Sequence, residues 1–252
     1  MSQSNEWEPY AASVKNVTIL IDIGNTAIKW QLRESGQVTH RGRGELSGLT
    51  RWLESLKCLS SQQVAVSCVK DEGFVRELQE ALAQLGCGNV VFAKSSALHA
   101  DVKNAYANPS ALGVDRWLAV LALKSLGQES GIVVDVGTAC TIDLLENGHH
   151  LGGFILPGPN LACDALVANT DMIRYASEPP AALEPGTDTG SCVVSGAWLT
   201  IVGAVKEISL RYPQCPLFLS GGAAPTLIDL GVEGQLVTDL VFDGLYFWLN
   251  GA

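Results

Sequence analysis

The sequence has few basic residues: 16 Lys and Arg stand against 26 Asp and Glu, and the formal net charge is −10. Proteins that bind duplex nucleic acids neutralise phosphates with Lys and Arg. The composition therefore argues against a nucleic-acid partner. The acidity itself mainly favours solubility.

Paired cysteines and long apolar runs are also missing. The cysteines never form a CxxC pair, which is typical of reduced thiols in a cytoplasmic protein. No apolar run approaches the roughly 20 residues of a membrane helix, and the N-terminal segment lacks the basic start and apolar stretch of a signal peptide. We therefore expect a cytoplasmic protein with no membrane partner, in which residues 1–16 form a loose N-terminal extension. The scattered cysteines are Cys58, Cys68, Cys87, Cys140, Cys163, Cys192 and Cys215.

Well-known catalytic and nucleotide-binding motifs are missing as well. The sequence has no GxxxxGK[ST] phosphate loop, no GxGxxG after a strand and no nucleophile elbow of a hydrolase. His149 and His150 follow an Asn-Gly turn without a partner at metal-ligand spacing, so we expect both to be exposed hairpin residues. If the chain binds a nucleotide, it must use another kind of phosphate-binding element.

Strand and helix patterns fill most of the 252 residues, and 47% of them are hydrophobic, enough for one large or two modest domains. In the first half we expect three strands, a helix, a strand, a helix and a strand, at 17–23, 27–33, 37–43, 46–56, 64–69, 73–85 and 90–93. In the second half we expect a helix from Gly113, strands at 131–136, 141–145 and 151–155, helices at 160–167 and 189–210, a strand at 216–220 and helices at 225–230 and 239–249. A βββαβα order therefore occurs twice.

The two halves also resemble each other in sequence. ILIDIGNTAIKWQL around Asp22 and IVVDVGTACTIDLL around Asp135 share a buried strand, an Asp-x-Gly turn and a Thr-bearing second strand. The distance between them is too long for a solenoid repeat and suits duplicated domains. We therefore predict an α/β protein with an N-terminal domain at 17–112 and a C-terminal domain at 113–252.

Each Asp-x-Gly element has a chemistry suited to phosphates and cations. The strand delivers a carboxylate to its C-terminal end, and the glycine allows a tight turn whose backbone amides can approach an anion. Two such turns facing each other could clamp the phosphates of ATP while Asp22 and Asp135 hold cations, which phosphoryl transfer requires. Either turn alone could merely close a hairpin, but the matched pair favours the phosphate interpretation.

Two other glycine-rich segments accompany predicted strands. In LFLSGGAAP the backbone amides could line an adenine and ribose, and a plain loop is the alternative. LGGFILPGPN, from Leu151 to Asn160, suggests a backbone that something approaches closely, and a structural turn remains equally open.

The segment YANPSALGVDRW leads into the first helix of the second half. Asp115 is explained by an N-terminal cap. Arg116 is not, because the positive end of a helix disfavours a cation unless an anion lies there. A substrate that bears a carboxylate would explain this arginine.

Together, DIGNTAIK, YANPSALGVDRW, DVGTACT, LGGFILPG, GTDT and LSGGAAP resemble the type III pantothenate kinases, members of the acetate and sugar kinase, Hsp70 and actin superfamily. The similarity runs from Val17 to the C-terminus, and NPSALGVDR and GGFILPG are similar to this family in particular. The resemblance implies two ribonuclease H-like, actin-like domains of duplicated βββαβαβα order with an ATP cleft between them. It also implies phosphorylation of pantothenate to 4'-phosphopantothenate, the first step of coenzyme A biosynthesis.

The resemblance further implies roles for individual residues. Asp115 would be the general base, because a carboxylate that accepts the hydroxyl proton assists attack on the γ-phosphorus. Asp22 would hold Mg²⁺ through water, Asp135 would bind a monovalent cation, K⁺ or NH₄⁺, and Arg116 could pair with the pantothenate carboxylate. The implied ATP contacts are Asp22, Ile23, Gly24, Asn25, Thr26, Ala27, Ile28, Lys29 and Thr138. The implied pantothenate contacts are Tyr106, Gly113, Val114, Asp115, Arg116 and Thr189.

Two positions depart from the family pattern. Asp188 occupies the position of the family's usual Asn, and Asn169-Thr170 occupies that of an Arg-Thr pair, so the outer wall of the pocket is affected. The resemblance also implies a homodimer. The alternatives are another small-molecule kinase of the same superfamily and a non-catalytic regulatory accessory protein on the same fold.

Overall fold

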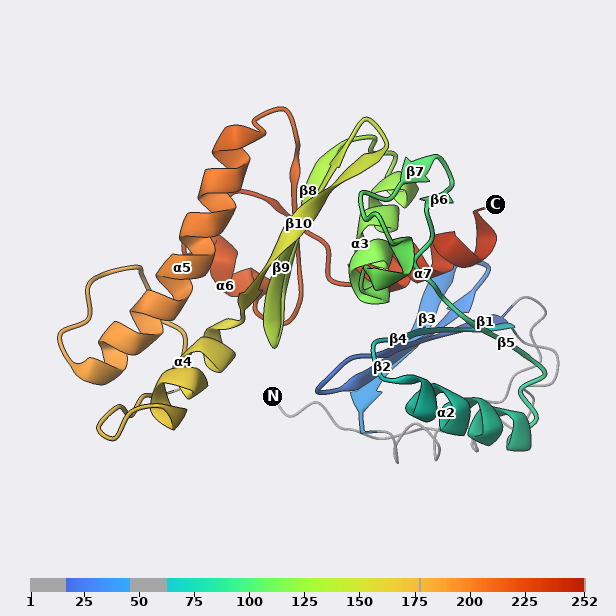
Figure 1. The fold of residues 1–252 in the computed structure, drawn as a ribbon, viewed down its shortest axis with the longest axis horizontal. Helices are drawn as coiled ribbons and strands as arrows, with labels where there is room; N and C mark the ends of the chain where they lie inside the picture. Colours follow the sequence, from blue (N-terminus) through green and yellow to red (C-terminus); the bar gives the residue numbers. More distant parts are fainter. Residues whose placement is uncertain (1–16, 46–62, 177, 252) are drawn as a thin grey trace. The chain divides into compact units, whose positions relative to one another are not determined.

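The structure is a computed structural model that describes residues 17–45, 63–176 and 178–251. The extension at 1–16, the predicted helix at 46–56 and Cys58 lie outside the described residues. The chain divides into two compact units (Figure 1). Unit 1 comprises Met1–Ala100, Asn108–Ala122 and Val241–Ala252, and unit 2 comprises Asp101–Ala107 and Leu123–Leu240. The units are discontinuous in sequence, and the domain boundary after residue 112 stays a prediction.

Unit 1 contains a five-stranded sheet of order β3-β2-β1-β4-β5. The strands β1 to β3 form the antiparallel meander that the sequence predicts, and β4 and β5 continue the sheet in parallel with β1. Both faces of β1 are buried, which its continuous apolar run VTILIDI requires. The strands are β1 (Val17–Ile23), β2 (Ile28–Glu34), β3 (Gln37–Gly44), β4 (Gln63–Cys68) and β5 (Asn89–Phe92).

The helices α2 (Glu72–Gln84) and α7 (Leu240–Asn250) both belong to unit 1 and are anchored to the rest of it. In α2 the N-cap Asp71 accepts a hydrogen bond from the amide of Phe74, and Leu78 and Leu82 pack into the core with β1 and β4. The helix α7 is tied to β2 because the buried Arg33 donates to Asp243 Oδ1 at 2.6 Å. The Arg33 guanidinium also lies 5.0 Å from the centre of the Tyr246 ring.

Unit 2 is built on a mixed sheet in which β12, β11, β8, β9, β10 and β7 are successive neighbours. The strands β8, β9 and β10 form a second antiparallel meander, and β11 adds in parallel to β8. A β-bulge interrupts β10 between His150 and Gly152. The strands are β7 (Val102–Lys103), β8 (Gly131–Val136), β9 (Ala139–Glu146), β10 (His149–Pro157), β11 (Leu217–Ser220) and β12 (Gln235–Leu236).

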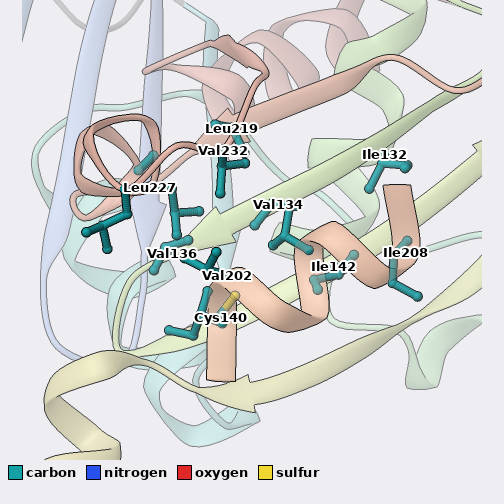
Figure 2. Packing of buried hydrophobic residues seen from close by; sticks show 14 of the residues in the cluster. Ile132, Val134, Val136, Cys140, Ile142, Val202, Ile208, Leu219, Leu227 and Val232 are labelled. Atoms are coloured by element: carbon teal, nitrogen blue, oxygen red, sulfur yellow. The ribbon is translucent and has the colours of Figure 1, made fainter. Parts of the chain in front are cut away.

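The core of unit 2 lies between this sheet and the helices α5 (Thr189–Arg211) and α6 (Ala224–Asp229). Figure 2 shows alternate residues of β8, Ile132, Val134 and Val136, packed with Val202 and Ile208 of α5. This alternation gives β8 one face toward α5 and leaves Val133 and Asp135 on the other. A shorter helix, α4 (Pro159–Ala168), packs against α5 through Cys163, Val193 and Ala197.

The helix α5 is long and apolar enough, by length and composition, to cross a membrane. The sequence analysis expected no such stretch. Its buried residues, however, include Trp198, Ile201 and Val205, which pack into the core of unit 2. A core helix passes the same test, so the length and hydropathy of α5 are weak grounds for a membrane span.

The predicted elements within the described residues are observed, with ends that shift by one or two residues. The helix from Gly113 is α3 (Val114–Ser125). Several short elements were not predicted: β6 (Leu98–His99), β7, β12 and a 3₁₀ turn at Pro109–Ala111. Strands of two residues have no periodicity that a sequence pattern can register.

Candidate functional site

The first Asp-x-Gly turn lies where β1 ends. Asp22 is buried, and its partners in the neighbouring strands are Lys29 of β2 and Ser67 of β4. The amide of Gly24 donates to the carbonyl of Ala27 at 3.1 Å, which closes the turn. The amide of Val69 donates to the carbonyl of Ile23, also at 3.1 Å, so the segment after β4 holds the start of the turn.

Basic side chains accompany this first turn. Lys70 Nζ donates to the carbonyl oxygen of Asn25 at 2.9 Å, and Lys29 is exposed at the start of β2. The neighbouring Cys68 is not a candidate nucleophile, because burial, and secondarily the charge of Asp22, raises the pKa of its thiol. The turn therefore combines backbone amides, one buried carboxylate and cationic side chains.

The second Asp-x-Gly turn lies where β8 ends. Asp135 is half-buried, and its strand partners are Thr141 of β9 and Ser220 of β11, neither of which is charged. The amide of Gly137 donates to the carbonyl of Ala139 at 2.9 Å, and Thr138 at the tip is exposed. Burial, together with the charge of Asp135, raises the pKa of Cys140 to about 12, so this thiol stays protonated.

Both remaining glycine-rich segments contact the second turn through their backbones. The amide of Gly158, in LGGFILPGPN, donates to the carbonyl of Thr138 at 2.9 Å, and a Cβ on Gly158 would lie 2.6 Å from that oxygen. Gly221, in the SGG loop, has φ +91°, and a Cβ there would lie 2.6 Å from the amide nitrogen of Val136. The backbone that approaches Gly158 and Gly221 closely is therefore that of the turn after Asp135.

The helix α3 begins with the acidic and basic pair. Asp115 Oδ1 accepts a hydrogen bond from the amide of Arg116 at 2.8 Å, and the arginine side chain is buried. A Cβ on Gly113 would lie 2.8 Å from Asp115 Oδ1, so the glycine leaves room for the carboxylate. Asp115 is the second residue of α3, inside the first turn rather than at the cap position before Val114, so the N-cap interpretation is wrong; its carboxylate still lies at the positive end of the helix.

Tyr106 and His150 lie together in unit 2. Their rings stack with centroids 6.4 Å apart and planes 14° from parallel. The expectation that His150 is an exposed hairpin residue is wrong: its side chain is 0% exposed, and its Nε2 donates to Asp143 Oδ1 at 3.0 Å. His149 is exposed as expected. Only the side-chain alternation along β10 separates the two histidines, and the sequence does not show which one faces inward.

The residues that depart from the family pattern have clear local roles. Asp188 caps α5 by accepting from the amide of Ser191 at 2.9 Å, and its pKa is lowered chiefly by that hydrogen bond. Asn169 and Thr170 donate to carbonyls of Ala165 and Leu166 at the end of α4. The exposed Thr189 follows as the first residue of α5.

An apolar groove of about 340 Å³ lies between α4 and α5, and Thr189 is part of its lining. Leu166 of α4 and Cys192 and Gly196 of α5 also line the groove. The sequence analysis did not anticipate this groove, because it depends on how two helices pack rather than on any motif.

The predicted site residues divide between the two units. Unit 1 holds the segment Asp22 to Lys29 and the segment Gly113 to Arg116, whereas unit 2 holds Tyr106, Asp135, Thr138 and Thr189. Within residues 17–45, 63–176 and 178–251, no group of three or more His, Cys, Asp or Glu side chains could hold a metal ion. A cation bound by these residues would therefore have at most two such side chains as ligands, completed by backbone oxygens, water or a bound phosphate.

A family model described as type III pantothenate kinase matches residues 18–211. The curated relative from Pseudomonas aeruginosa (strain LESB58) named type III pantothenate kinase is 35% identical over 237 residues, covering 89% of this chain and 96% of the relative. The relative of the same name from Ectopseudomonas mendocina is 38% identical over 238 residues, with the same coverage.

Solved structures show the same fold at lower sequence identity. A conserved Baf family protein from Campylobacter jejuni, named for transcriptional activation, has a TM-score of 0.62 at 20% identity and covers 92% of this chain and 98% of its own. The ethanolamine utilization protein EutJ from Carboxydothermus hydrogenoformans has a TM-score of 0.54 at 17% identity, covering 96% of this chain and 92% of its own. These likenesses bear on the fold alone.

Proposed function

This chain belongs to the type III pantothenate kinase family and phosphorylates pantothenate in coenzyme A biosynthesis; from that premise we propose which residues perform the reaction. Family membership decides against the two alternatives, a kinase for a different substrate and a non-catalytic accessory protein. The observation that carries the residue assignment is the pair of Asp-x-Gly turns, one at the C-terminal end of the first strand in each unit's meander.

The first turn is assigned to the phosphates of ATP. Besides the amide of Gly24, which closes the turn, it has the backbone amides of Asn25 and Thr26; the exposed Lys29 follows in sequence, and Lys70 donates to the Asn25 carbonyl. A polyphosphate needs both kinds of group. In this assignment the segment Asp22 to Lys29 binds ATP together with Thr138 of the second turn.

The second turn is assigned to a monovalent cation, K⁺ or NH₄⁺. The donor set fits such an ion, because Asp135 supplies a half-buried carboxylate and the tight turn supplies carbonyl oxygens. When bound, the cation would offset negative charge near the phosphates. Asp22, buried where β1 ends, fits a Mg²⁺ site reached through water, because Mg²⁺ retains several bound waters and such a water would donate a hydrogen bond to the carboxylate.

Pantothenate is assigned to Tyr106, Val114, Thr189 and the start of α3. Asp115 is the general base: its carboxylate accepts the proton of the primary hydroxyl as that oxygen forms the new bond to the γ-phosphorus and the bond to ADP breaks. Gly113 leaves the space that this carboxylate occupies. Arg116 pairs with the carboxylate of pantothenate, which explains a cation at the positive end of a helix.

The first experiment is an assay of ADP release with and without pantothenate, in potassium and in sodium buffer, with Mg²⁺ present. The proposal expects turnover that depends on both pantothenate and potassium. Equal turnover in potassium and sodium would contradict the cation site. We also propose a homodimer and a cytoplasmic location; light scattering on the purified protein tests the first, and fractionation of the source cells tests the second.

The base assignment is tested by Asp115→Asn. The variant keeps the shape of the side chain, so folding stability should change little, while kcat should fall by about 10² to 10⁴-fold. Turnover and urea unfolding measured on the same preparation separate the two effects. Near-normal kcat in a folded variant would remove Asp115 from the role of base.

A further inference from the structure

We propose that His150 is a positioning residue for pantothenate binding, which fixes the ring of Tyr106 and is itself fixed by Asp143. This proposal rests on the assignment of Tyr106 to the pantothenate pocket. All three residues belong to unit 2.

The His150–Asp143 pair is buried in a way that the fold does not require. The side chains are 0% and 2% exposed, and Nε2 lies 3.0 Å from Oδ1. Asp143 interrupts the run Ile142, Leu144, Leu145 on β9, where an apolar residue would serve the core. Because replacing a buried polar pair with packed apolar side chains of the same shape can be neutral or stabilising, stability alone is a weak reason for this pair.

The register of the sheet explains how the two residues meet. His150 of β10 lies opposite Leu145 of β9. Asp143 is two residues before Leu145 on β9, so His150 and Asp143 are diagonal neighbours on the same face of the sheet. The bulge that follows His150 shifts the rest of β10 by one residue. The inward direction of this histidine is therefore set separately from that of the segment leading to Gly158.

The pairing of β10 with β7 brings Tyr106 near the histidine. The strand β7 pairs with β10 at Lys103 and His149, and the chain reaches Tyr106 three residues later. The Asn104 side chain accepts the amide hydrogen of Tyr106 at 2.9 Å, which fixes its backbone. The plane of the tyrosine ring lies 14° from that of the imidazole, with the two ring centroids 6.4 Å apart, so the two rings are arranged as a near-parallel aromatic pair.

The His150 side chain makes one hydrogen bond among the described residues, the one to Asp143. Its Nδ1 is buried and has no hydrogen-bond partner among the residues that the structure describes. The imidazole is thus hydrogen-bonded to Asp143 through Nε2, and its ring lies near-parallel to that of Tyr106, with centroids 6.4 Å apart. Pantothenate that contacts Tyr106 would then depend on a three-residue support, Asp143 to His150 to Tyr106, in which only the tyrosine meets the substrate.

The test is a double-mutant cycle with Tyr106→Ala, His150→Ala and the double variant, in which KM for pantothenate, KM for ATP and kcat are measured separately. We expect His150→Ala to raise the pantothenate KM roughly three- to tenfold, as for the loss of an aromatic pair, with kcat and the ATP KM unchanged within about twofold. In the Tyr106→Ala background the His150 substitution should have no further effect. The exposed neighbour His149→Ala is the matched control and should behave as the parent enzyme.

Each outcome decides between the two proposals. If Tyr106→Ala leaves the pantothenate KM unchanged, the assignment of Tyr106 fails and this proposal falls with it. If Tyr106→Ala raises that KM but His150→Ala does not, only the positioning role is wrong. Effects that add in the double variant would also overturn it, because His150 would then act without Tyr106.

A second set of variants covers the case in which His150→Ala does not fold. His150→Gln retains a donor for Asp143 but loses the ring, and Asp143→Asn retains an acceptor for His150. The proposal expects Asp143→Asn to affect the pantothenate KM less than His150→Gln does. A purely structural pair would instead lower the urea midpoint in both variants and leave the pantothenate KM of the folded enzyme unchanged, which would overturn the proposal.

Discussion

The two Asp-x-Gly turns begin alike and end differently. In the first turn, four residues separate the paired residues Ile23 and Ile28. In the second turn, three residues separate the paired residues Val136 and Cys140. The aspartate of the first turn has Lys29 as its partner in the next strand, whereas Asp135 has Thr141. One sequence pattern therefore produces two local environments.

The support behind each turn differs too. A lysine side chain, Lys70, reaches the first turn, whereas the backbones of Gly158 and Gly221 contact the second. A turn with cations beside it suits an anion, and a carboxylate with carbonyl oxygens around it suits a cation. The comparison thus supports a division of labour, with phosphate at the first turn and a monovalent cation at the second.

The largest expected effect comes from removing each carboxylate in turn. Asp22→Asn should lower kcat/KM for ATP by about 10² to 10³-fold, because charge stabilisation around the transferred phosphoryl group is the main catalytic contribution. Asp135→Asn should instead raise the potassium concentration needed for half-maximal activity and reduce the preference for potassium over sodium. Titrations of Mg²⁺ and K⁺ on both variants check this, and identical responses would abolish the distinction between the turns.

The next effect concerns the different packing of the turns. Gly221→Ala combines a positive φ with a Cβ forced against the Val136 backbone, so it should destabilise unit 2 by about 2 to 4 kcal/mol. Gly24→Ala is the matched change in the first turn, where the Cβ would lie 3.4 Å from the Ala27 carbonyl, an ordinary contact. Urea unfolding should therefore show less than about 1 kcal/mol for the second variant. Equal losses would mean that both turns are packed equally tightly.

The sequence predicted the strand–turn–strand elements and the family because their signals are local: an apolar run, a glycine and a capped helix lie next to one another in the chain. The comparisons with known proteins confirm the family, and the assignment of single site residues stays a prediction. What the sequence missed depends on partners far apart in the chain. His150 was misread because its partner Asp143 lies on another strand and a bulge adjusts the register. The contact of Gly221 with Val136 likewise exists only once β11 pairs with β8.

A smaller effect comes from Cys140, which stands in the second turn where Ile28 stands in the first. Its pKa is about 12 in the folded protein against 9.0 for an unperturbed thiol. Above pH 9 the unfolded chain ionises this thiol while the folded chain keeps it protonated, so the free energy of unfolding falls as pH rises through this window. The contribution approaches about 1 kcal/mol per pH unit.

The check compares the parent protein with Cys140→Ala in urea between pH 8 and pH 10, a range set around the unperturbed value. The other titrating groups are the same in both, so the difference in slope isolates the buried thiol. A parent and a Cys140→Ala variant with the same pH dependence would show that the thiol does not titrate differently on folding.

The smallest expected effect tests the lysine support that only the first turn has. Lys70 is solvent-accessible, so its charge is screened, and Lys70→Met should raise the KM for ATP only about two- to fivefold while the pantothenate KM stays the same. Lys70→Arg should restore most of the ATP affinity, because it keeps a donor and a positive charge near the Asn25 carbonyl. The loss in Lys70→Met should shrink in 0.5 M salt if it is electrostatic, whereas a salt-independent loss would indicate that Lys70 shapes the turn rather than attracting phosphate. If Lys70→Met leaves the ATP KM unchanged at low salt, Lys70 does not contribute to ATP binding. The two turns would then differ only in loop length and in glycine packing.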